Sequence, residues 1–314
     1  MQLPRPPQDI ARAGVRALKT VILADGELHE LERGYIDAVQ RHILHTEFDL
    51  DALDTIDGKE LASLVPPGDF RERILRSAVM AALIDTEASP AELAVIEDFA
   101  AALEVDAAPV RDLQRLVDQR LTLFRFDIVR RSFIGKRFEQ HLATKGVRGL
   151  AQLAAAFAGF ENESIAARYR ALKSLPEGTL GRGYHDFIDR NGFGMPGEKN
   201  GAPEPIVFHD CVHVLAEYDT TPGEEVSVVG FQAGFQNYDP FFTMLFVVAQ
   251  FHLGVRISPV AGTTKLAIDP DAMTRAFVRG TACTRDLSDG WDPWEDFGTP
   301  VTVLRERYNI VPRS

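Results

Sequence analysis

The amino-acid sequence predicts an all-α protein made of two helical domains. Along most of the 314 residues, apolar side chains recur at intervals of three and four, which places them on one face of a helix. Segments that alternate apolar and polar residues, as half-buried strands do, are few. Charge divides the chain as well, because residues 1–120 carry 23 acidic and 13 basic side chains whereas the remainder carries 23 and 21. We therefore expect an acidic helical domain over residues 1–120, a connector over 121–149 and a second helical domain over 150–314.

The first 120 residues contain an internal repeat with an offset of sixty residues. Leu23-Ala24-Asp25-Gly26-Glu27 aligns without gaps on Leu83-Ile84-Asp85-Thr86-Glu87, and a further glutamate follows in each copy, Glu32 or Glu92. Apolar helical runs lie before and after each copy, at 10–23, 35–44, 74–84 and 93–103. Each copy is therefore predicted to form two helices with the acidic residues in the turn between them.

Two interpretations of these acids are open. In the first, the two turns form one pocket for a divalent cation, made by Asp25, Glu27, Asp85 and Glu87. In the second, the acids cap helix starts and meet the positive ends of the helix dipoles. We favour capping for Glu32 and Glu92, because Ser89-Pro90-Ala91-Glu92 has the form of a capping box with proline at the first helical position. This domain resembles the TerB-like tellurite-resistance domain, including its A-D-G-E…E signature, although Thr86 replaces the glycine in the second copy.

The connector has a different composition. Between residues 120 and 138 the only acid is Asp127, whereas six side chains are basic and are interleaved with apolar ones. The basic residues are Arg120, Arg125, Arg130, Arg131, Lys136 and Arg137. This pattern predicts a basic amphipathic helix, which favours anionic lipid head groups at a membrane surface. The alternative is an interdomain helix whose arginines pair with the acidic first domain.

The second domain is predicted to consist of helices separated by loops. The expected helices span 151–160, 165–175, 183–190, 208–216, 226–237, 241–255, 270–283 and 301–308. The most apolar of them, 241–255, contains Gln250 and His252 and is too short to cross a bilayer. Two cysteines, Cys211 and Cys283, give no disulfide framework, and no signal-peptide pattern begins the chain. We therefore expect a cytoplasmic protein, soluble or peripheral on the inner membrane face, and its acidic charge argues against nucleic-acid binding.

The most informative feature is the segment His209-Asp210-Cys211-Val212-His213, which is followed by eleven residues and then Glu225. Histidines four apart lie on one helix face, and Asp210, about 100° round the helix, can lean toward the same point. Glu225 must arrive from a second helix, after the break at Thr220-Thr221-Pro222-Gly223. Two imidazoles and two carboxylates suit one divalent metal ion, zinc first, with iron, cobalt or manganese as alternatives. Glu224 competes with Glu225 for the role of ligand.

This H-D-x-x-H-x₁₁-E pattern resembles the signature of the family of the fourth coenzyme Q (ubiquinone) biosynthesis protein. Upstream, Leu175-Pro176-Glu177-Gly178-Thr179-Leu180-Gly181-Arg182-Gly183-Tyr184 is similar to the family's L-P-x-G-[ST]-L-G-x-x-Y segment. Downstream, Ala276-Phe277-Val278-Arg279-Gly280, Trp291-Asp292 and the ending from Arg305 to Pro312 resemble its C-terminal helices. The resemblance covers residues 150–314 and departs from the family at Glu224, where the family usually has glycine.

The resemblance implies a metal-dependent enzyme whose substrate is a polyprenylated hydroxybenzoate-type lipid, decarboxylated oxidatively at ring carbon C1. Its metal ligands and catalytic residues would be His209, Asp210, His213 and Glu225. The prenyl tail would occupy an apolar tunnel, for which the candidates are Phe231, Phe235, Phe242, Leu245 and Phe246, although their spacing is also that of a helical core. Expected partners are other quinone-biosynthesis proteins and an anionic membrane surface, and a homo-oligomer is compatible with the sequence.

Two other functions are open. One is a non-catalytic lipid-binding scaffold of a quinone-biosynthesis complex in which the metal is structural. A closed coordination shell would favour this scaffold, and open coordination positions would favour the enzyme. The other is a metal-dependent phosphohydrolase of the H-D type, which we rank last because no lysine lies between Lys199 and Lys265.

Overall fold

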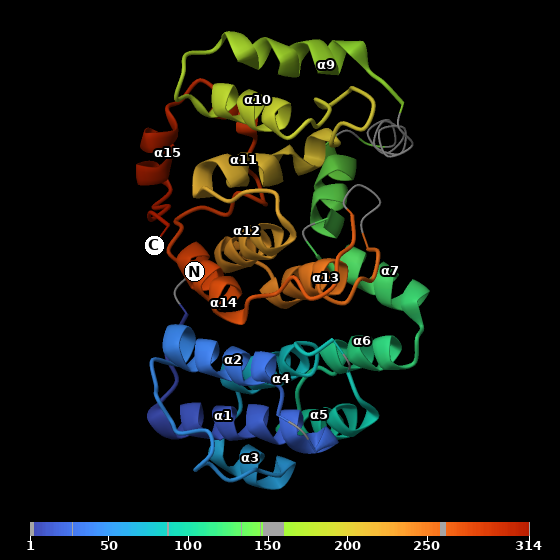
Figure 1. Cartoon of the computed structure of the whole chain (residues 1–314), viewed down its shortest axis with the longest axis vertical. Helices are drawn as coiled ribbons and strands as arrows, with labels where there is room; N and C mark the ends of the chain where they lie inside the picture. The colour runs from blue at the N-terminus through green and yellow to red at the C-terminus, as the bar shows by residue number, and fades with distance from the viewer. Residues whose placement is uncertain are drawn as a thin grey trace.

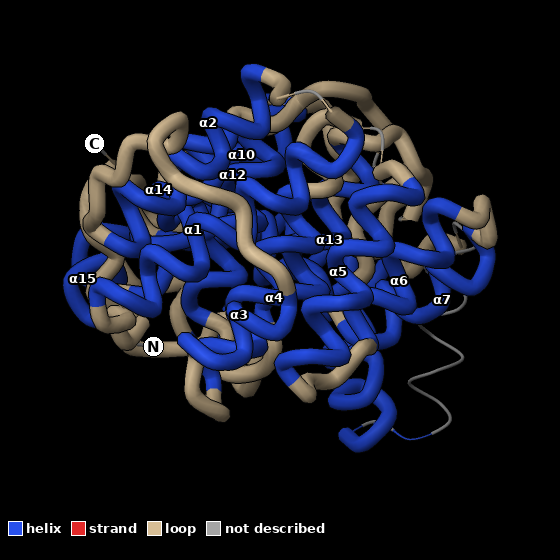
Figure 2. The backbone as a smooth tube through the Cα atoms, turned by 90° about the horizontal axis from the view of Figure 1, so that it is seen from below, coloured by secondary structure: helices blue, strands red, loops and turns tan. Residues whose placement is uncertain are grey.

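The computed structural model is helical throughout the part of the chain that it describes. The described residues are 3–26, 28–86, 88–132, 134–144, 146, 160–257 and 262–313. Within them, helices are joined by loops, and β-structure is limited to isolated bridges (Figure 2). The prediction of an all-α fold is therefore confirmed. None of the helices described combines the length and the apolarity that are needed to cross a membrane.

The N-terminal part forms a layer of six helices at the lower end of Figure 1. These are α1 (Gln8–Ile22), α2 (Glu30–Ala38), α3 (Gly58–Leu64), α4 (Asp69–Ala81), α5 (Pro90–Leu103) and α6 (Ala108–Val117). A π-helical turn, Val39–Leu44, prolongs α2. Helix α1 packs against α4, and α3 packs against α5. Apolar side chains at helical spacing supply the contacts, as Val15, Leu18 and Ile22 of α1 are all buried.

Both copies of the sequence repeat form two helices around an acidic turn. The first turn lies between α1 and α2, and the second lies between α4 and α5. Gly26 has a φ of 99° and the equivalent residue Thr86 has a φ of 81°, so both turns pass through the left-handed region. Glu32 and Glu92 each accept a hydrogen bond from the backbone N–H at the start of their own helix, at 2.8 Å. The prediction that these two glutamates cap helices is confirmed.

The connector is divided rather than being one helix. Helix α7 (Leu121–Arg131) ends where Ser132 takes an extended backbone with ψ of 177°. The chain is helical again over 134–144, where the backbone N–H of Lys136 donates to the carbonyl of Ser132. Ser132 therefore ends one helix and begins the next. Residue 145 and residues 147–149 of the expected connector helix lie outside the described residues.

The C-terminal part forms a second stack of helices above the first (Figure 1). It contains α9 (Glu163–Arg170), α10 (Leu180–Arg190), α11 (Val207–Ala216), α12 (Pro222–Phe235), α13 (Pro240–Phe251), α14 (Pro270–Thr281) and α15 (Val301–Arg307). Short 3₁₀ turns lie at Ala171–Ser174, Glu204–Ile206 and Pro293–Glu295. These elements begin and end close to the predicted helices, whereas the helix expected at 151–160 falls almost entirely outside the described residues.

Helices α12 and α14 cross with their backbones in contact. A Cβ atom on Gly234 would come within 2.1 Å of the Phe277 carbonyl, and one on Gly280 would come within 2.0 Å of the Phe231 carbonyl. No side chain fits at either position, so the crossing requires glycine. Because α12 carries Glu225, this contact fixes the position of one candidate metal ligand.

Polar contacts join the two layers across their boundary. Asp271 at the start of α14 accepts hydrogen bonds from Arg41 at 2.6 Å and pairs with His42 at 2.8 Å. His252, buried after α13, lies 2.7 Å from the carbonyl of Ile84 in the second acidic turn. The buried apolar residues of both layers belong to one continuous core. The two layers are therefore packed against each other by both polar and apolar contacts.

Candidate metal centre

Two neighbouring helices bring three ligand side chains together. Helix α11 carries His209 and His213 on one face, and the first turn of α12 carries Glu225. The two Nε2 atoms lie 3.2 Å apart. One oxygen of Glu225 lies 3.3 Å from Nε2 of His209, and the other lies 3.5 Å from Nε2 of His213. Among the residues that the structure describes, this is the one group of His, Cys, Asp or Glu side chains that can hold a metal ion.

The spacing of these atoms fits a metal better than it fits direct hydrogen bonds. Ligands at the usual 2.0–2.2 Å from a tetrahedral zinc are separated from one another by about 3.3–3.6 Å. The two separations from Glu225, 3.3 and 3.5 Å, fall within that range, and the separation of the two Nε2 atoms, 3.2 Å, lies just below it. Hydrogen bonds between nitrogen and oxygen are shorter, at about 2.9–3.0 Å. The coarser part of the metal prediction, a centre able to hold one ion, is therefore confirmed.

His213 is oriented by contacts on both sides of its ring. Its Nδ1–H can donate to the carbonyl of Tyr218, at 3.2 Å, and its ring stacks on Phe187 with centroids 5.1 Å apart. A proton held on Nδ1 leaves the lone pair of Nε2 facing Glu225, which is the tautomer that a metal requires. The imidazole of His213 is therefore oriented to coordinate a metal through Nε2.

His209 is oriented by an amide that the sequence analysis did not identify. The side-chain nitrogen of Gln232 on α12 lies 2.7 Å from Nδ1 of His209, while the amide oxygen is buried and has no hydrogen-bond partner within the described part of the chain. Rotating the amide by half a turn lets that oxygen accept a proton from Nδ1, and this frees Nε2 for a metal. Gln232 lies seven residues after Glu225, on the same helix face. That spacing is the signal from which its role could have been found.

The charges at the centre stabilise one another. Burial raises the pKa of Glu225, but the neighbouring imidazoles of His209 and His213 outweigh burial and hold that pKa at about 2. Burial also lowers the pKa of His209, and the neighbouring carboxylate of Glu225 raises it above the ordinary value. Glu225 is therefore ionised at neutral pH, as a carboxylate ligand must be.

Asp210 lies beside this group but outside it, since its carboxylate is not among the ligand atoms that come together. Burial raises its pKa to about 6, although the charges of His209 and His213 oppose the shift. Burial, followed by the charge of Asp210, raises the pKa of Tyr184 on α10. The Tyr184 hydroxyl is buried and has no hydrogen-bond partner among the described residues. The Asp210 carboxyl group thus lies close to His209, His213 and Glu225, and the Tyr184 phenol lies close enough to Asp210 to feel its charge.

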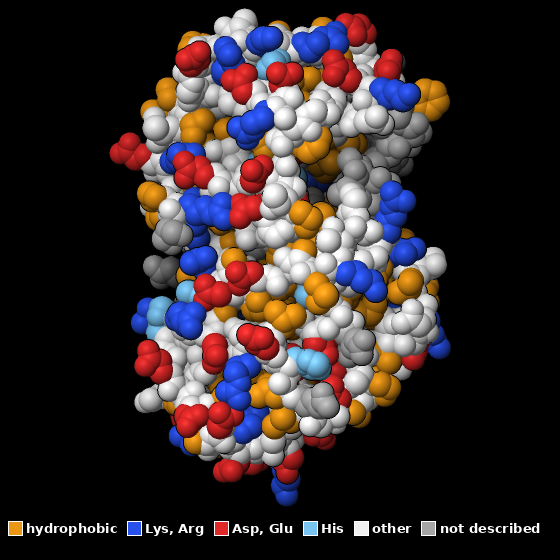
Figure 3. Space-filling model, in the orientation of Figure 1, with side chains coloured by type: hydrophobic (Ala, Val, Ile, Leu, Met, Phe, Trp, Pro, Cys, Tyr) orange, Lys and Arg blue, Asp and Glu red, His pale blue; other side chains and the backbone are white. Residues whose placement is uncertain are grey.

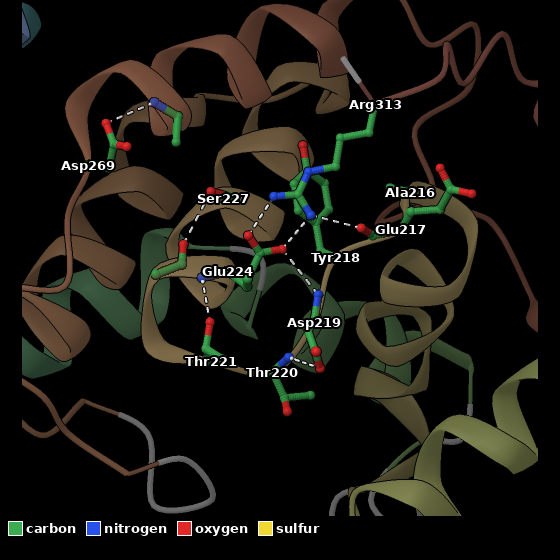
Figure 4. Close-up of polar contacts among 12 residues, drawn as sticks. Ala216, Glu217, Tyr218, Asp219, Thr220, Thr221, Glu224, Ser227, Asp269 and Arg313 are labelled. Carbon is green, nitrogen blue, oxygen red and sulfur yellow. Dashed lines mark hydrogen bonds and ion pairs between the residues drawn. The ribbon is translucent and has the colours of Figure 1, made fainter.

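Glu224, the alternative ligand, has a different partner. It forms an ion pair with Arg313 near the C-terminus, and it accepts a hydrogen bond from the backbone of Asp219 at 3.2 Å (Figure 4). Successive residues of a helix point about 100° apart. When Glu225 faces the histidines, Glu224 therefore faces Arg313. The structure thus selects Glu225 of the two candidates.

Arginines from the C-terminal segments hold the end of α11. Arg305 donates to the carbonyls of Leu215 at 2.8 Å and Val214 at 3.2 Å, and Arg279 donates to the carbonyl of Ala216 at 2.8 Å. The last carbonyls of a helix have no partner within it, and they carry its negative dipole end. These cations therefore stabilise the helix that presents both histidines.

The acids of the N-terminal repeat approach one another without forming a comparable centre. Burial, the charge of Asp85 and the charge of Asp25 are among the causes that raise the pKa of Glu32 to about 8 and that of Glu92 to about 7. One oxygen of each glutamate is buried and has no hydrogen-bond partner among the residues that the structure describes. Among the described residues, however, these acids do not form a group with the spacing of metal ligands. Glu27 and Glu87, the other two acids of the expected pocket, lie outside the described residues.

The five candidates for the lipid tunnel are buried core residues. Phe231, Phe235, Phe242, Leu245 and Phe246 are each at most 5% exposed, and all belong to the continuous apolar core. The rings of Phe231 and Phe235 pack edge to face with centroids 5.6 Å apart. Close packing of this kind is typical of a helical core. These contacts support the core interpretation of the five side chains, and the lipid tunnel stays a prediction.

The basic residues of the connector are largely engaged within the protein. Asp127 accepts hydrogen bonds from Arg115 and Arg130, and it also lies 3.4 Å from Arg131. The guanidinium of Arg131 lies over the ring of Phe242, 4.8 Å from its centroid. Acidic and basic side chains are also interleaved over the face that Figure 3 shows. Asp127 thus pairs within its own helix and with Arg115 of α6, and Arg131 packs on α13, so these contacts leave the pairing of connector arginines with first-domain acids a prediction.

Comparison of the chain with models of known protein families found no match, and comparison with curated proteins found no significant relative.

Proposed function

We propose that this protein is a metal-dependent enzyme of quinone biosynthesis that acts on a polyprenylated hydroxybenzoate-type lipid. The observation that carries the proposal is the approach of His209, His213 and Glu225 to within 3.5 Å of one another. The sequence resemblance to the coenzyme Q biosynthesis family supplies the substrate class and the reaction. The resemblance of residues 1–120 to the TerB-like domain does not add an activity to this proposal.

The ligand set supports an enzyme. The described residues supply three ligands, two nitrogen and one carboxylate, and catalytic zinc sites commonly have three protein ligands with a further position for substrate. When bound, a divalent ion supplies a positive charge that stabilises negative charge on the substrate's oxygens and ring. The neighbouring side chains would orient the head group, because Asp210 can accept a hydrogen bond and Tyr184 can donate one.

The proposed reaction breaks the bond between C1 and the carboxyl group, which leaves as carbon dioxide. Water supplies the oxygen that forms the new bond to C1, and dioxygen takes up the two electrons and two protons and leaves as hydrogen peroxide. Zinc has no redox chemistry of its own, so with zinc the electron-rich ring must react with dioxygen directly. Iron or cobalt would satisfy the same ligands and is the alternative.

A prenylated substrate lies in a membrane, so the protein must reach its surface. Helix α7 supports such contact, because Leu123 is 54% exposed and Phe126 is 69% exposed on the same helix face. Arg120 and Arg130 lie beside them, with side chains 65% and 53% exposed. An apolar pair flanked by cations is the composition that binds an anionic lipid surface.

The second candidate is a lipid-binding scaffold in which the same three residues hold a structural metal. Side chains packed in the core at Phe231 and Phe235, in place of an open tunnel, favour this alternative.

The test combines metal analysis with turnover. Protein purified without chelators is analysed for metal content and for co-purifying lipid, then incubated with a prenylated hydroxybenzoate under air. Release of carbon dioxide by the wild type but not by Glu225→Gln supports the enzyme. A full metal complement and bound lipid without turnover support the scaffold, and metal content below one-tenth per chain refutes both.

A further inference from the structure

A cavity lies at the boundary between the two layers, away from the metal centre. Its volume is about 310 Å³. The N-terminal layer contributes side chains from α2, its π-helical extension and α4, and the C-terminal layer contributes α12, α13 and α14. Pockets for small molecules usually have volumes of about 300–1,000 Å³ and occur where domains meet. The cavity is therefore large enough for a small ligand.

The walls of this cavity are apolar and adaptable. Three methionines line it, Met80, Met244 and Met273, although the whole chain contains only five. Phe241 and Phe277 add aromatic surface. Methionine is unbranched and polarisable, and it is used where a binding surface must fit flexible apolar ligands. These walls suit a hydrocarbon chain.

Two arginines of α4 line the cavity, and one of them, Arg73, has spare hydrogen-bonding capacity. The other, Arg76, pairs with Glu72 at 2.9 Å and with Asp239 at 3.1 Å. Arg73, one turn earlier on α4, donates to the carbonyl of Pro4 at 3.2 Å. Asp69, which also lines the cavity one turn before Arg73, acts on Arg73 through its charge, but among the described residues no carboxylate forms an ion pair with Arg73. A guanidinium has five N–H donors, so most of those on Arg73 remain for a ligand.

Helix α12 separates this cavity from the metal centre. Gln232 faces His209 on one side of the helix, whereas Ala233 and Gly234 line the cavity on the other. The two sites therefore share a wall but no lining residue among those named. A ligand in the cavity and a metal at His209 can be measured independently.

We propose that this interdomain cavity binds a fatty acid, with its chain among the three methionines and its carboxylate on Arg73. An engineered apolar cavity of about 150 Å³ takes one benzene ring, so a cavity twice that size takes a chain of about a dozen carbons. A carboxylate matches the planar donor pair of an arginine and can accept two parallel hydrogen bonds. The inference does not depend on the proposed function of the metal centre.

The test measures binding of dodecanoate to the full-length, delipidated protein by titration calorimetry. Dodecanol, which has the same chain without the charge, and dodecyltrimethylammonium, which carries the opposite charge, serve as comparison probes. We expect one dodecanoate per chain, with both other probes binding at least tenfold more weakly. Arg73→Gln should reduce affinity for dodecanoate about tenfold and leave affinity for dodecanol unchanged. Arg33→Gln, which removes an arginine that pairs with Asp51 away from the cavity, should change neither.

Two variants that fill the cavity complete the test. Met244→Trp and Ala233→Leu should each abolish dodecanoate binding while the thermal unfolding transition remains cooperative; the second is available if the first does not fold. Equal affinity of wild type and Arg73→Gln, or binding retained in a folded cavity-filled variant, overturns the proposal, as does a wild type that binds no dodecanoate. The His209→Ala/His213→Ala variant should still bind dodecanoate, which separates this proposal from the one for the metal centre.

Discussion

The amide of Gln232 lies 2.7 Å from Nδ1 of His209, so the helix that supplies Glu225 also orients an imidazole of the neighbouring helix. Outer contacts of this kind set the tautomer of a ligand and typically change metal affinity by about 10- to 100-fold when removed. We therefore expect Gln232→Leu to weaken zinc binding by about that factor, measured by competition with a chromogenic chelator.

Gln236, the residue that follows the end of α12, provides the control. Both ends of its amide are buried and have no partner among the described residues, and its side chain is fully buried. Replacing an unsatisfied buried amide by an apolar group of similar size is close to neutral or stabilising. Gln236→Leu should therefore leave zinc affinity unchanged and preserve or raise the melting temperature. Equal loss of zinc affinity in both variants would contradict the role given to Gln232.

Adjacent glutamates allow a second test of the metal centre. Glu225→Gln removes a ligand charge and should lower metal content well below one ion per chain, as should His209→Ala. Glu224→Gln, which breaks the pair with Arg313, should leave metal content unchanged and cost less than about 1 kcal/mol of stability, as surface ion pairs do. Elemental analysis of the purified variants gives the answer. Full metal content in the His209→Ala/His213→Ala double variant would eliminate the site.

The sequence predicted this centre almost completely, and the exceptions have physical causes. Helical periodicity located α11 and α12 and thus both histidines. Spacing favoured Glu225 but left Glu224 as a competitor, because the partner of Glu224 is Arg313, which is 89 positions further along the chain. Asp210 was expected as a ligand, yet its position round the helix leaves its carboxylate outside the group. The angular position of a residue on its helix can be read from the sequence, but the side chains that it contacts on other elements cannot.

The fold was also predictable where patterns are local. Ser89 and Glu92 gave the start of α5, and the capping contacts are present at 2.8–3.1 Å. The break at Ser132 was not predicted, since basic and apolar residues continue through it without glycine or proline until Gly135. The crossing of α12 and α14 at Gly234 and Gly280 joins distant segments, and local patterns contain no information on such pairs.

The left-handed turns of the repeat predict opposite effects for reciprocal substitutions. Gly26 has φ of 99° and Thr86 has φ of 81°, and a β-branched residue is strained there by about 1–2 kcal/mol. Gly26→Thr should lower the free energy of unfolding by about that amount. Thr86→Gly should raise it by less than about 1 kcal/mol, because glycine also increases the entropy of the unfolded chain. Urea unfolding measures both changes, and effects of the same sign would show that the turns are not equivalent.

The raised pKa values of Glu32 and Glu92 predict that the free energy of unfolding falls as the pH rises. The carboxyls bind protons more tightly in the folded chain, with pKa values of about 8 and about 7, than in the unfolded chain, where the ordinary pKa is 4.5. Their contribution is complete below about pH 4.5 and is lost as the pH rises through 7 and 8. Glutamine keeps the capping hydrogen bond and cannot ionise.

Glu32→Gln/Glu92→Gln should therefore match the wild type at pH 5 and be more stable at pH 9 by about 1–2 kcal/mol. Urea unfolding at both pH values tests this expectation. A difference that does not depend on pH would contradict it. Stabilisation of the wild type alone by added calcium at pH 9 would instead favour the cation-pocket interpretation of these acids.

The exposed face of α7 predicts salt-sensitive membrane binding. We expect the wild type to sediment with vesicles that contain anionic lipid at low salt, and binding to fall as salt screens the arginines. Leu123→Ser/Phe126→Ser should reduce the bound fraction at least fivefold. Val303→Ser, on exposed α15 at the opposite side of Figure 1, is the control and should have no effect. Equal binding by all three proteins would assign α7 to interdomain packing alone.

The metal ligands all lie between His209 and Glu225, whereas the walls of the interdomain cavity extend from Leu3 to Thr281. Closing a short segment of chain costs less entropy than closing a long one. The α11–α12 pair can therefore assemble from contacts that are nearly local, while the cavity exists only after both ends of the chain have docked. Hydrogen exchange should distinguish the metal centre from the cavity. A bound metal should slow exchange chiefly in α11 and α12, whereas a ligand in the cavity should slow it in α4 and α14 together.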